Sequence, residues 1–437
     1  MKRDSKFYKY EMILLFLSLF VLVLYYSVIF IYIHLQKVPD FSWQLYPFYI
    51  FLYIPFLYSI FYHIKNKTYK FEKIDFILLA YLFICIISTI FSTNINNSLF
   101  GRDSRNEGIF TIIFYILIVI LSKNMVTKEN ILKIINMIFG FGILQVLCGI
   151  TQSYFKWFSF FDEMAYGFSS NPNMYGLLMG LLLTMALNLY LDTSKKYYLL
   201  CTICFYIGLL LAESSGPFFM FALFALFILI YHFLKKTDRK KLVLLIVILI
   251  TLLPLVQFSN QYVNTKYYEK YPEKASYNKD YAKINTDIFK IINLVIPQKT
   301  IESDNSTVTK DMTHGKTEIW KATIKVARKN LLTGVGLESL NIIWPNENRV
   351  EILDKAHNQY LDVLVSTGLI GAIIYITLIA TVIMMSIRVK SDIMFCLSLG
   401  FLYYSATILF NISVPYTATY YYIIMGLIIG LYHENNG

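Results

Sequence analysis

The chain has 437 residues, of which 57% are hydrophobic and 15% charged, and its formal net charge is +11. Its apolar runs are long enough to cross a hydrocarbon layer of roughly 30 Å, which excludes an ordinary water-soluble domain. The positive charge needs no nucleic-acid partner, because no folded cytoplasmic domain carries a basic patch. The composition therefore predicts a polytopic membrane protein.

Twelve apolar segments predict an all-α bundle. The first, about residues 11 to 34, is too long for a signal-peptide core and lacks a small-residue cleavage site, so we expect a retained helix. The others lie near residues 45–64, 74–91, 108–122, 131–155, 173–191, 197–212, 216–234, 241–259, 359–386, 393–410 and 418–433. We expect nine transmembrane helices in 1–259, one large loop with amphipathic helices in 260–358, and three transmembrane helices in 359–437.

Lysine and arginine decide the expected orientation. Twenty of them lie at the N-terminus and in alternate short loops, four lie in the opposite short loops, and fifteen lie in the large loop. Short cytoplasmic loops are enriched in these residues, whereas long loops cross the membrane largely regardless of charge. Both termini are therefore predicted to be cytoplasmic, and the large loop is predicted to lie outside.

The second outer loop, residues 98–111, carries two arginines and an acid between apolar segments. Arg102 and Arg105 are spaced so that their guanidinium groups can grip one diphosphate, since each offers paired donors to phosphate oxygens. An equally favoured alternative is a group of interfacial charges paired with Asp103 and Glu107.

The third outer loop ends in SSNPNMYG, residues 169–176. Asn171 and Asn173 are placed to hydrogen-bond sugar hydroxyls, but turn formation and helix capping are the favoured explanation. The next outer turn has a single charge, Glu213, which we expect to be solvated.

Two parts of the large loop are predicted to be amphipathic helices on the outer membrane surface. These are residues 281–295 and 316–329. In the second helix, Lys316 falls on the same side as Trp320. A role in positioning substrate and a role in covering the bundle are about equally favoured.

Other groups in the large loop carry a weaker signal. Gly334 and Gly336 are placed either to cradle an anion or, as we favour, to form the turn after a helix. Asp311, His314 and Glu318 match no spacing that we can tie to a divalent ion, so no metal or other cofactor is predicted.

His357 closes the large loop, in the stretch AHNQYLDVLVSTGLIG of residues 356–371. A histidine at this water–lipid boundary can exchange a proton near neutral pH. Asn358 lies beside it, and Asp362 follows about one helical turn later. A lone interfacial histidine is more often structural than catalytic, but only His314 competes with His357 as an outward-facing base.

Four segments, in chain order, resemble the superfamily of O-antigen ligases and Wzy-type polysaccharide polymerases, which are integral membrane glycosyltransferases. They are GRDSRNEG, NPNMYG, KTEIWKATIKVARKNLLTGVGLESL and AHNQYLDVLVSTGLIG. The resemblance implies a GT-C-like helical bundle in the bacterial cytoplasmic membrane. It also implies transfer of a glycan, without a metal, from an undecaprenyl-diphosphate carrier to an acceptor hydroxyl on a glycan, lipid or protein at the outer face.

The resemblance further implies residue roles. His357 would activate the acceptor, Arg102 and Arg105 would neutralise the diphosphate, and Lys316 would add a cation where relatives commonly have arginine. A second departure is Ser215, where relatives often have arginine. The other predicted substrate-binding residues are Glu107, Asn171, Asn173 and Asn358.

Two other functions stay open at this point. One is a flippase or transporter for lipid-linked glycans, which should need charge inside the spans, whereas the candidate charges gather on the outer side. The other is an inactive partner in envelope assembly, an alternative that Ser215 and Lys316 leave open.

Overall fold

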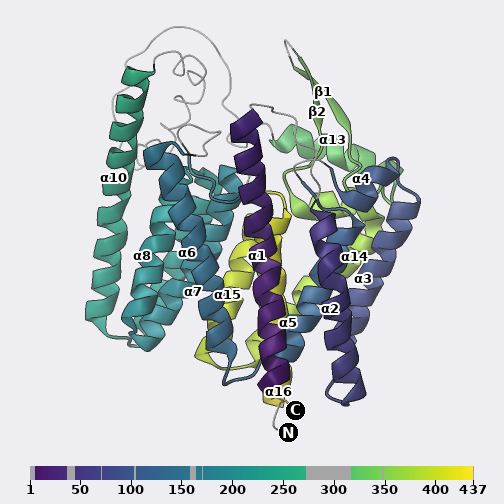
Figure 1. Ribbon diagram of the computed structural model, residues 1–437, viewed down its shortest axis with the longest axis horizontal. Coiled ribbons are helices and arrows are strands. Elements are labelled where there is room, and N and C mark those ends of the chain that lie inside the picture. The colour runs from purple at the N-terminus through teal and green to yellow at the C-terminus, as the bar shows by residue number, and fades with distance from the viewer. Residues whose placement is uncertain are drawn as a thin grey trace.

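The computed structural model describes residues 5–36, 45–69, 71–102, 105–157, 164–169, 171–271, 316–346 and 349–436. Within these ranges the chain forms fourteen helices and one two-stranded sheet, and most helices run side by side in a single bundle (Figure 1). The prediction of an all-α polytopic membrane protein is confirmed.

Twelve of the helices coincide with the twelve predicted apolar segments. They are α1 (Ser5–Gln36), α2 (Tyr46–Lys65), α3 (Lys73–Ile90), α5 (Ile109–Met125), α6 (Ile131–Phe155), α7 (Pro172–Thr193), α8 (Lys196–Leu211), α9 (Ser215–Leu234), α10 (Arg239–Lys270), α14 (Gln359–Arg388), α15 (Asp392–Thr407) and α16 (Pro415–Asn436). Within the described ranges, eight helices are long and apolar enough to span a membrane, and α5 and α8 are shorter apolar helices. Helix α10 continues well past the predicted end of its span at residue 259.

The short elements gather at one end of the bundle. They are α4 (Ile95–Phe100), α13 (Lys316–Lys329) and the antiparallel strands β1 (Ile342–Asn346) and β2 (Arg349–Leu353). Helix α13 matches the predicted amphipathic helix at 316–329, and the predicted helix at 281–295 lies outside the described residues. Both chain termini lie at the opposite end (Figure 1).

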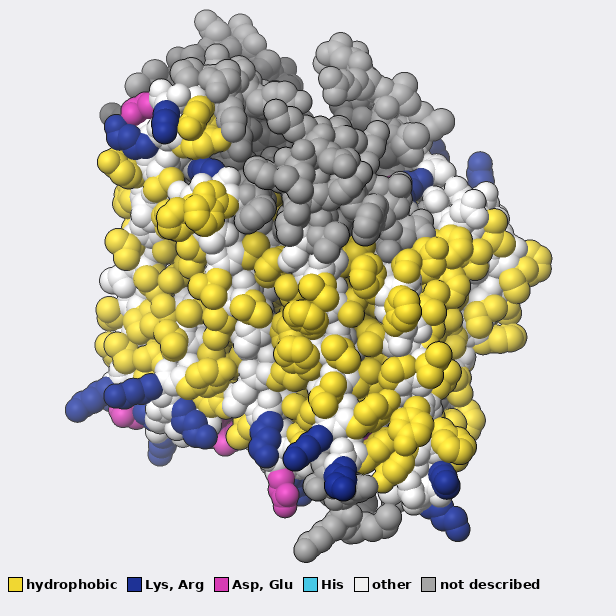
Figure 2. All heavy atoms as spheres, viewed as in Figure 1, with side chains coloured by type: hydrophobic (Ala, Val, Ile, Leu, Met, Phe, Trp, Pro, Cys, Tyr) yellow, Lys and Arg dark blue, Asp and Glu magenta, His cyan; other side chains and the backbone are white. Residues whose placement is uncertain are grey.

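Burial and charge follow the arrangement expected of a membrane bundle. Helix α7 is buried throughout the apolar window that defines it as a span, whereas the peripheral helices expose apolar side chains. Figure 2 shows these side chains covering the middle of one face, with Lys and Arg gathered along the end that holds the termini. Glycines allow the central helices to approach closely, as at Gly426, where a Cβ atom would lie 2.5 Å from the carbonyl oxygen of Val119 on α5.

Helix α14 is broken one third of the way along its length. Gly368 has φ 72° and ψ −174°, which interrupts the helical hydrogen bonds. Residues 331–336 fill the break, because the N–H of Leu369 donates to the carbonyl of Leu331 (2.8 Å) and the N–H of Val335 donates to that of Val365 (2.9 Å). Non-helical backbone at this depth is tolerated only where protein satisfies its polar groups.

The glycine pair of the large loop forms the turn that enters this break. Gly334 and Gly336 have φ +70° and +100°. The N–H of Gly334 donates to the carbonyl of Asn330 (2.9 Å), and that of Gly336 donates to the carbonyl of Ser366 (3.1 Å). These donors are therefore not available to an anion, which removes the cradle alternative and leaves the favoured turn.

Replacing Gly334 with alanine should destabilise the protein. The new Cβ would lie 2.1 Å from the carbonyl oxygen of Ser366, and the left-handed backbone alone costs a non-glycine residue roughly 1–2 kcal/mol. We expect a lower melting temperature in detergent for Gly334→Ala. Gly140→Ala on α6 is the matched control, because nothing lies within 4 Å of the point that its new Cβ would occupy. Equal melting temperatures for the two variants would contradict the packing of this turn.

Candidate functional site

His357 lies in the link between β2 and α14. Its φ is 52°, in the left-handed region that costs a non-glycine residue energy and is kept only where the surroundings impose it. The neighbours of His357 show what imposes this conformation, because each is bonded to a different part of the structure.

Two charged side chains hold the start of this link. The carboxylate of Asp354 accepts a hydrogen bond from Arg105, with 2.9 Å between Nε and Oδ2. The ammonium of Lys355 lies 2.6 Å from Glu338 and 3.5 Å from Glu107. Arg105 and Glu107 belong to the loop before α5, so this loop is joined to the histidine segment by two ion pairs.

Backbone groups and a helix cap hold the rest of the link. The N–H of Ala356 donates to Asp362 (2.7 Å), and its carbonyl accepts from the indole of Trp320 on α13 (3.0 Å). Asn358 caps α14 by accepting from the N–H groups of Tyr360 and Leu361 at 3.0 and 3.2 Å. Among the described residues, the imidazole of His357 has no hydrogen-bond partner.

The electrostatic surroundings favour a neutral imidazole. Burial lowers the pKa of His357, and the positive charges of Arg105 and Lys316 lower it further. The carboxylate of Asp354 acts in the opposite sense but does not offset them. A histidine with a lowered pKa is neutral at neutral pH, which is the form that accepts a proton.

Lys316 and Trp320 contact the same loop, as their shared helix face predicts. The ammonium of Lys316 donates to the carbonyl of Phe410 (2.9 Å), and the ring of Trp320 packs near that of Phe410 with 6.0 Å between centroids. Burial lowers the pKa of Lys316. Helix α13 therefore brings a second cation beside His357.

The arginines already have partners within the protein. Arg102 donates to the side-chain oxygen of Asn341. Burial alone would raise the pKa of Asp354, but its hydrogen bonds from Arg105 reverse this and lower it. The expected alternative paired the arginines with Asp103 and Glu107. Asp103 lies outside the described residues, and Glu107 bonds elsewhere.

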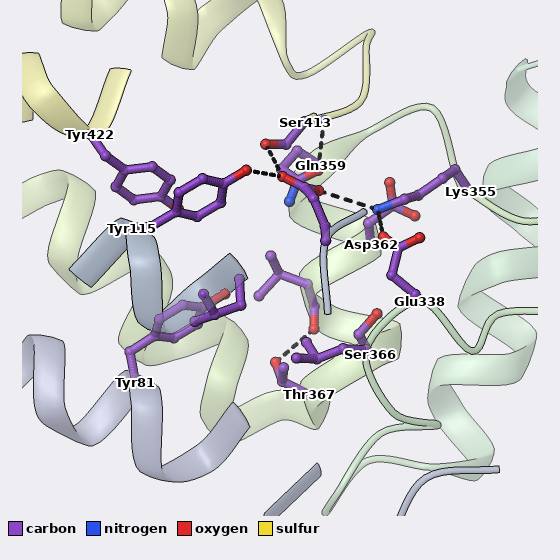
Figure 3. A pocket seen from close by; sticks show the side chains of 14 residues that line it. Tyr81, Tyr115, Glu338, Lys355, Gln359, Asp362, Ser366, Thr367, Ser413 and Tyr422 are labelled. Atoms are coloured by element: carbon purple, nitrogen blue, oxygen red, sulfur yellow. Dashed lines mark hydrogen bonds and ion pairs between the residues drawn. The ribbon is translucent and has the colours of Figure 1, made fainter. Parts of the chain in front are cut away.

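Glu107 is a buried residue that lines a small cavity. Its side chain accepts hydrogen bonds from Tyr115 (2.9 Å) and Ser413 (2.7 Å), and the residue is only 6% exposed. The cavity of about 30 Å³ has room for one or two water molecules. Figure 3 shows Lys355 and Glu338 on one side of it and Tyr115 and Ser413 near one another across it. Contact of Glu107 with the substrate stays a prediction.

The predicted asparagines of the third outer loop have structural partners. The side chain of Asn171 caps α7 by accepting from the N–H of Asn173 (2.8 Å), which confirms the capping alternative. Asn173 accepts from the hydroxyl of Ser214 (2.6 Å). Glu213, expected to be solvated, accepts instead from Asn260 on α10 (2.6 Å). Within the described residues, these bonds stay among α7, α9, α10 and their links, and none reaches the histidine segment.

Sequence reasoning did not find three residues that shape this site. Lys355, Glu338 and Ser413 come from three different segments and meet in the folded chain. No fixed spacing relates them, and a charged residue in a polar loop is usually solvated. The only available signal was the position of Lys355, two residues before His357.

The fold and the site together define a polytopic membrane protein with a cation-flanked histidine at one end of its bundle. Residues 199–376 match the family model described as O-Antigen ligase, which confirms the resemblance to the O-antigen ligase and Wzy superfamily. No curated protein matches the chain. This family indicates a glycosyl-transferring membrane protein of envelope polysaccharide, in the context of lipid-linked glycans.

The matched range covers α13, the glycine turn and His357, but it begins after Arg102 and Arg105. The structure joins the arginine loop to the matched range through the ion pair of Arg105 with Asp354. The geometry therefore adds residues to the site that the family match does not contain.

Lys316→Met should raise the pKa of His357, because removing a nearby positive charge makes protonation of the imidazole easier. The pKa can be followed by NMR of the protein labelled with ¹³C-histidine, with the signal assigned by its loss in His357→Ala. Lys321→Met is the control, since Lys321 is exposed on α13 and pairs with Glu318. Equal titration curves for the wild type and Lys316→Met would contradict the electrostatic contact.

Proposed function

We propose that the protein transfers a glycan from an undecaprenyl-diphosphate carrier to an acceptor hydroxyl, in the manner of an O-antigen ligase or polysaccharide polymerase. The observation that carries the proposal is a neutral imidazole, unpartnered among the described residues and flanked by two cations. The imidazole belongs to His357, and the cations are Arg105 and Lys316. An imidazole in this setting is suited to take a proton beside a polyanion.

The proposed transfer requires mainly that the protein stabilises the charge on the leaving diphosphate and aligns the acceptor hydroxyl with the anomeric carbon. The acceptor oxygen forms a bond to the anomeric carbon as the bond from that carbon to the diphosphate oxygen breaks. His357 takes the hydroxyl proton, and the departing diphosphate keeps the electron pair. Fixed cations aimed at the leaving group stabilise the charge that develops there. We propose that Arg102, Arg105 and Lys316 supply them, without a metal.

The pairing of Arg105 with Asp354 is compatible with diphosphate binding. A guanidinium has five N–H donors, and Asp354 is bonded through Nε and one Nη of Arg105. Among the described residues no partner is seen for the remaining donors, which we propose meet phosphate oxygens while Asp354 fixes the orientation of the group. Asn358 caps α14 through its side-chain oxygen, and glycan binding by this residue stays a prediction.

The arrangement of charge supports an outward-facing site. Both termini lie at the end rich in Lys and Arg, opposite to the end that carries α13 (Figures 1 and 2). Because lysine and arginine are enriched on the cytoplasmic side, this supports cytoplasmic termini and a site at the outer face of the bacterial cytoplasmic membrane. Sugar binding by Asn171 and Asn173 stays a prediction, with Asn173 exposed.

Reconstitution in liposomes with an undecaprenyl-diphosphate glycan and a hydroxyl acceptor tests this function. We expect the wild type to transfer the glycan and His357→Ala to lose at least about 100-fold of the turnover, because a positioned general base contributes roughly that much or more. Donor binding and the melting temperature should stay near the wild-type values. Product is measured by gel mobility of the glycosylated acceptor.

His433→Ala is the control, since His433 pairs with Glu72 at the opposite end of the bundle. Movement of the donor across the liposome membrane without an acceptor would favour transport instead. Absence of both transfer and movement would favour an assembly partner. A fully active His357→Ala would remove the histidine from the mechanism.

Arg105→Ala should weaken binding of the lipid donor by about tenfold or more, because a charge-assisted paired contact is lost. The donor affinity of Arg105→Lys should lie between those of the wild type and Arg105→Ala, because lysine keeps the charge but lacks the planar guanidinium. Affinity is measured with the donor in detergent micelles. Arg328→Ala provides the comparison, because Arg328 is exposed on α13. Unchanged donor affinity in Arg105→Ala would argue against the diphosphate clamp.

A further inference from the structure

A buried lysine joins three segments of the chain directly behind the histidine. Lys355 is almost completely buried and lies 2.6 Å from Glu338 and 3.5 Å from Glu107. We propose that Lys355 is a positioning residue, which docks the arginine loop and the segment after the glycine turn against the link that carries His357. This inference rests on the proposed function, because it concerns the geometry of the same site.

The contacts show that Lys355 acts on both partners of the site. Glu107 lies two residues after Arg105 in the loop before α5, and Lys355 lies two residues before His357. The ion pair of Lys355 with Glu107 therefore joins the same two segments as the ion pair of Arg105 with Asp354. Together the two pairs fix the spacing between the cation that would meet the diphosphate and the imidazole that would meet the acceptor.

Backbone strain marks the same three segments. Asn106, Glu338 and His357 have φ of 59°, 53° and 52°, so each segment passes through a left-handed residue at or near its contact with Lys355. Such conformations cost energy in residues other than glycine and persist when the surroundings over-determine them. Loss of the ion pairs would allow these turns to relax, and the imidazole would move with them.

The carboxylates are held by more than the lysine. Glu107 also accepts from Tyr115 and Ser413, and Asp362 holds the N–H of Ala356 from within the same cavity (Figure 3). Burial alone would lower the pKa of Lys355, but Glu338 and Glu107 raise it, so its charge is maintained. Because an unpaired buried charge is strongly disfavoured, the ammonium of Lys355 keeps the carboxylates of Glu107 and Glu338 close to it.

A second buried ion pair offers a matched control. Lys123 lies near the other end of α5, 2.5 Å from Asp75, and both side chains are nearly inaccessible. Removing Lys123 leaves one buried carboxylate without its cation, and removing Lys355 leaves two. Lys123→Met therefore reports the cost of losing a buried ion pair, whereas Lys355→Met reports that cost together with the displacement of His357.

The test compares kcat, KM for the donor and the pH profile of transfer in four variants. They are Lys355→Met, Lys355→Arg, the double variant Lys355→Met with Glu338→Gln, and Lys123→Met. The double variant removes both charges of the closest pair, so it is the one expected to stay folded. For it we expect kcat to fall about 100-fold, the loss that a displacement near 1 Å can cause, with KM changed much less.

Loss of the Lys355 charge should also move the acidic limb of the pH profile to higher pH. Within the described part of the chain, Arg105, Lys316, Asp354 and Lys355 are charged groups that act on His357, and Lys355 is one of those that lower its pKa. Lys355→Arg should restore part of kcat and return the limb towards that of the wild type. Wild-type kcat and an unchanged pH profile in the folded double variant would overturn the inference. An equal loss of kcat in Lys123→Met would overturn it as well.

The positioning role of Lys355 can be tested even if the wild type transfers no glycan. That result would end the proposed function, and the position of His357 is then tested by its ¹³C NMR signal alone. We expect the double variant to shift and broaden this signal and to raise the pKa of His357, whereas Lys123→Met should leave it unchanged. An identical His357 signal in the wild type and the double variant would overturn the positioning role.

Discussion

The contact of one buried ammonium with two carboxylates holds together the end of the bundle that carries α13 and His357. Lys355, Glu107 and Glu338 come from three separate segments of the chain, and none of their charges is stable alone away from water. Because each charge is stabilised by the others, the loop before α5, the glycine turn and the histidine link are held in one arrangement. This contact positions the segments that carry His357 and the arginines, and the cation of α13 lies beside them.

The membrane setting explains why so much of the site is built from irregular backbone. A helix in a bilayer satisfies its own polar groups, whereas an irregular link with left-handed residues does not. Here the break of α14 at Gly368 is filled by residues 331–336, and the hydroxyl of Ser88 on α3 donates to the carbonyl of Ser366. Residues 331–336 and Ser88 thus satisfy backbone groups at the break. The candidate site lies at the end of the bundle that carries α13.

The elements that could be predicted from the sequence are those with a strong periodic or compositional signal. The twelve apolar helices follow from apolar runs, and α13 follows from a period of 3.6 that also places Lys316 with Trp320. The break at Gly368 was missed because one glycine in an apolar run looks the same as a packing glycine such as Gly426. The hairpin of β1 and β2 was missed because it lies inside a polar loop.

The site itself was only partly accessible in this way. His357 and the arginines stood out as polar residues at predicted helix ends. The capping role of Asn171 was also favoured from the sequence, because a cap is a local contact. The orientation of Glu107 towards the cavity and the pairing of Lys355 depend instead on tertiary contacts between distant segments. Side-chain direction at the end of a transmembrane helix is decided by its neighbours, and a single sequence does not contain that arrangement.

The plug of residues 331–336 in the break of α14 has a consequence for biogenesis. These residues leave the ribosome before Gly368 does, and Ser88 leaves before both. Helix α14 therefore completes its hydrogen bonds only when residues 331–336 pack into its break, because the carbonyls of Val365 and Ser366 accept from Val335, Gly336 and Ser88. Substitutions in residues 331–336 are therefore expected to lower the yield of folded protein as well as its activity.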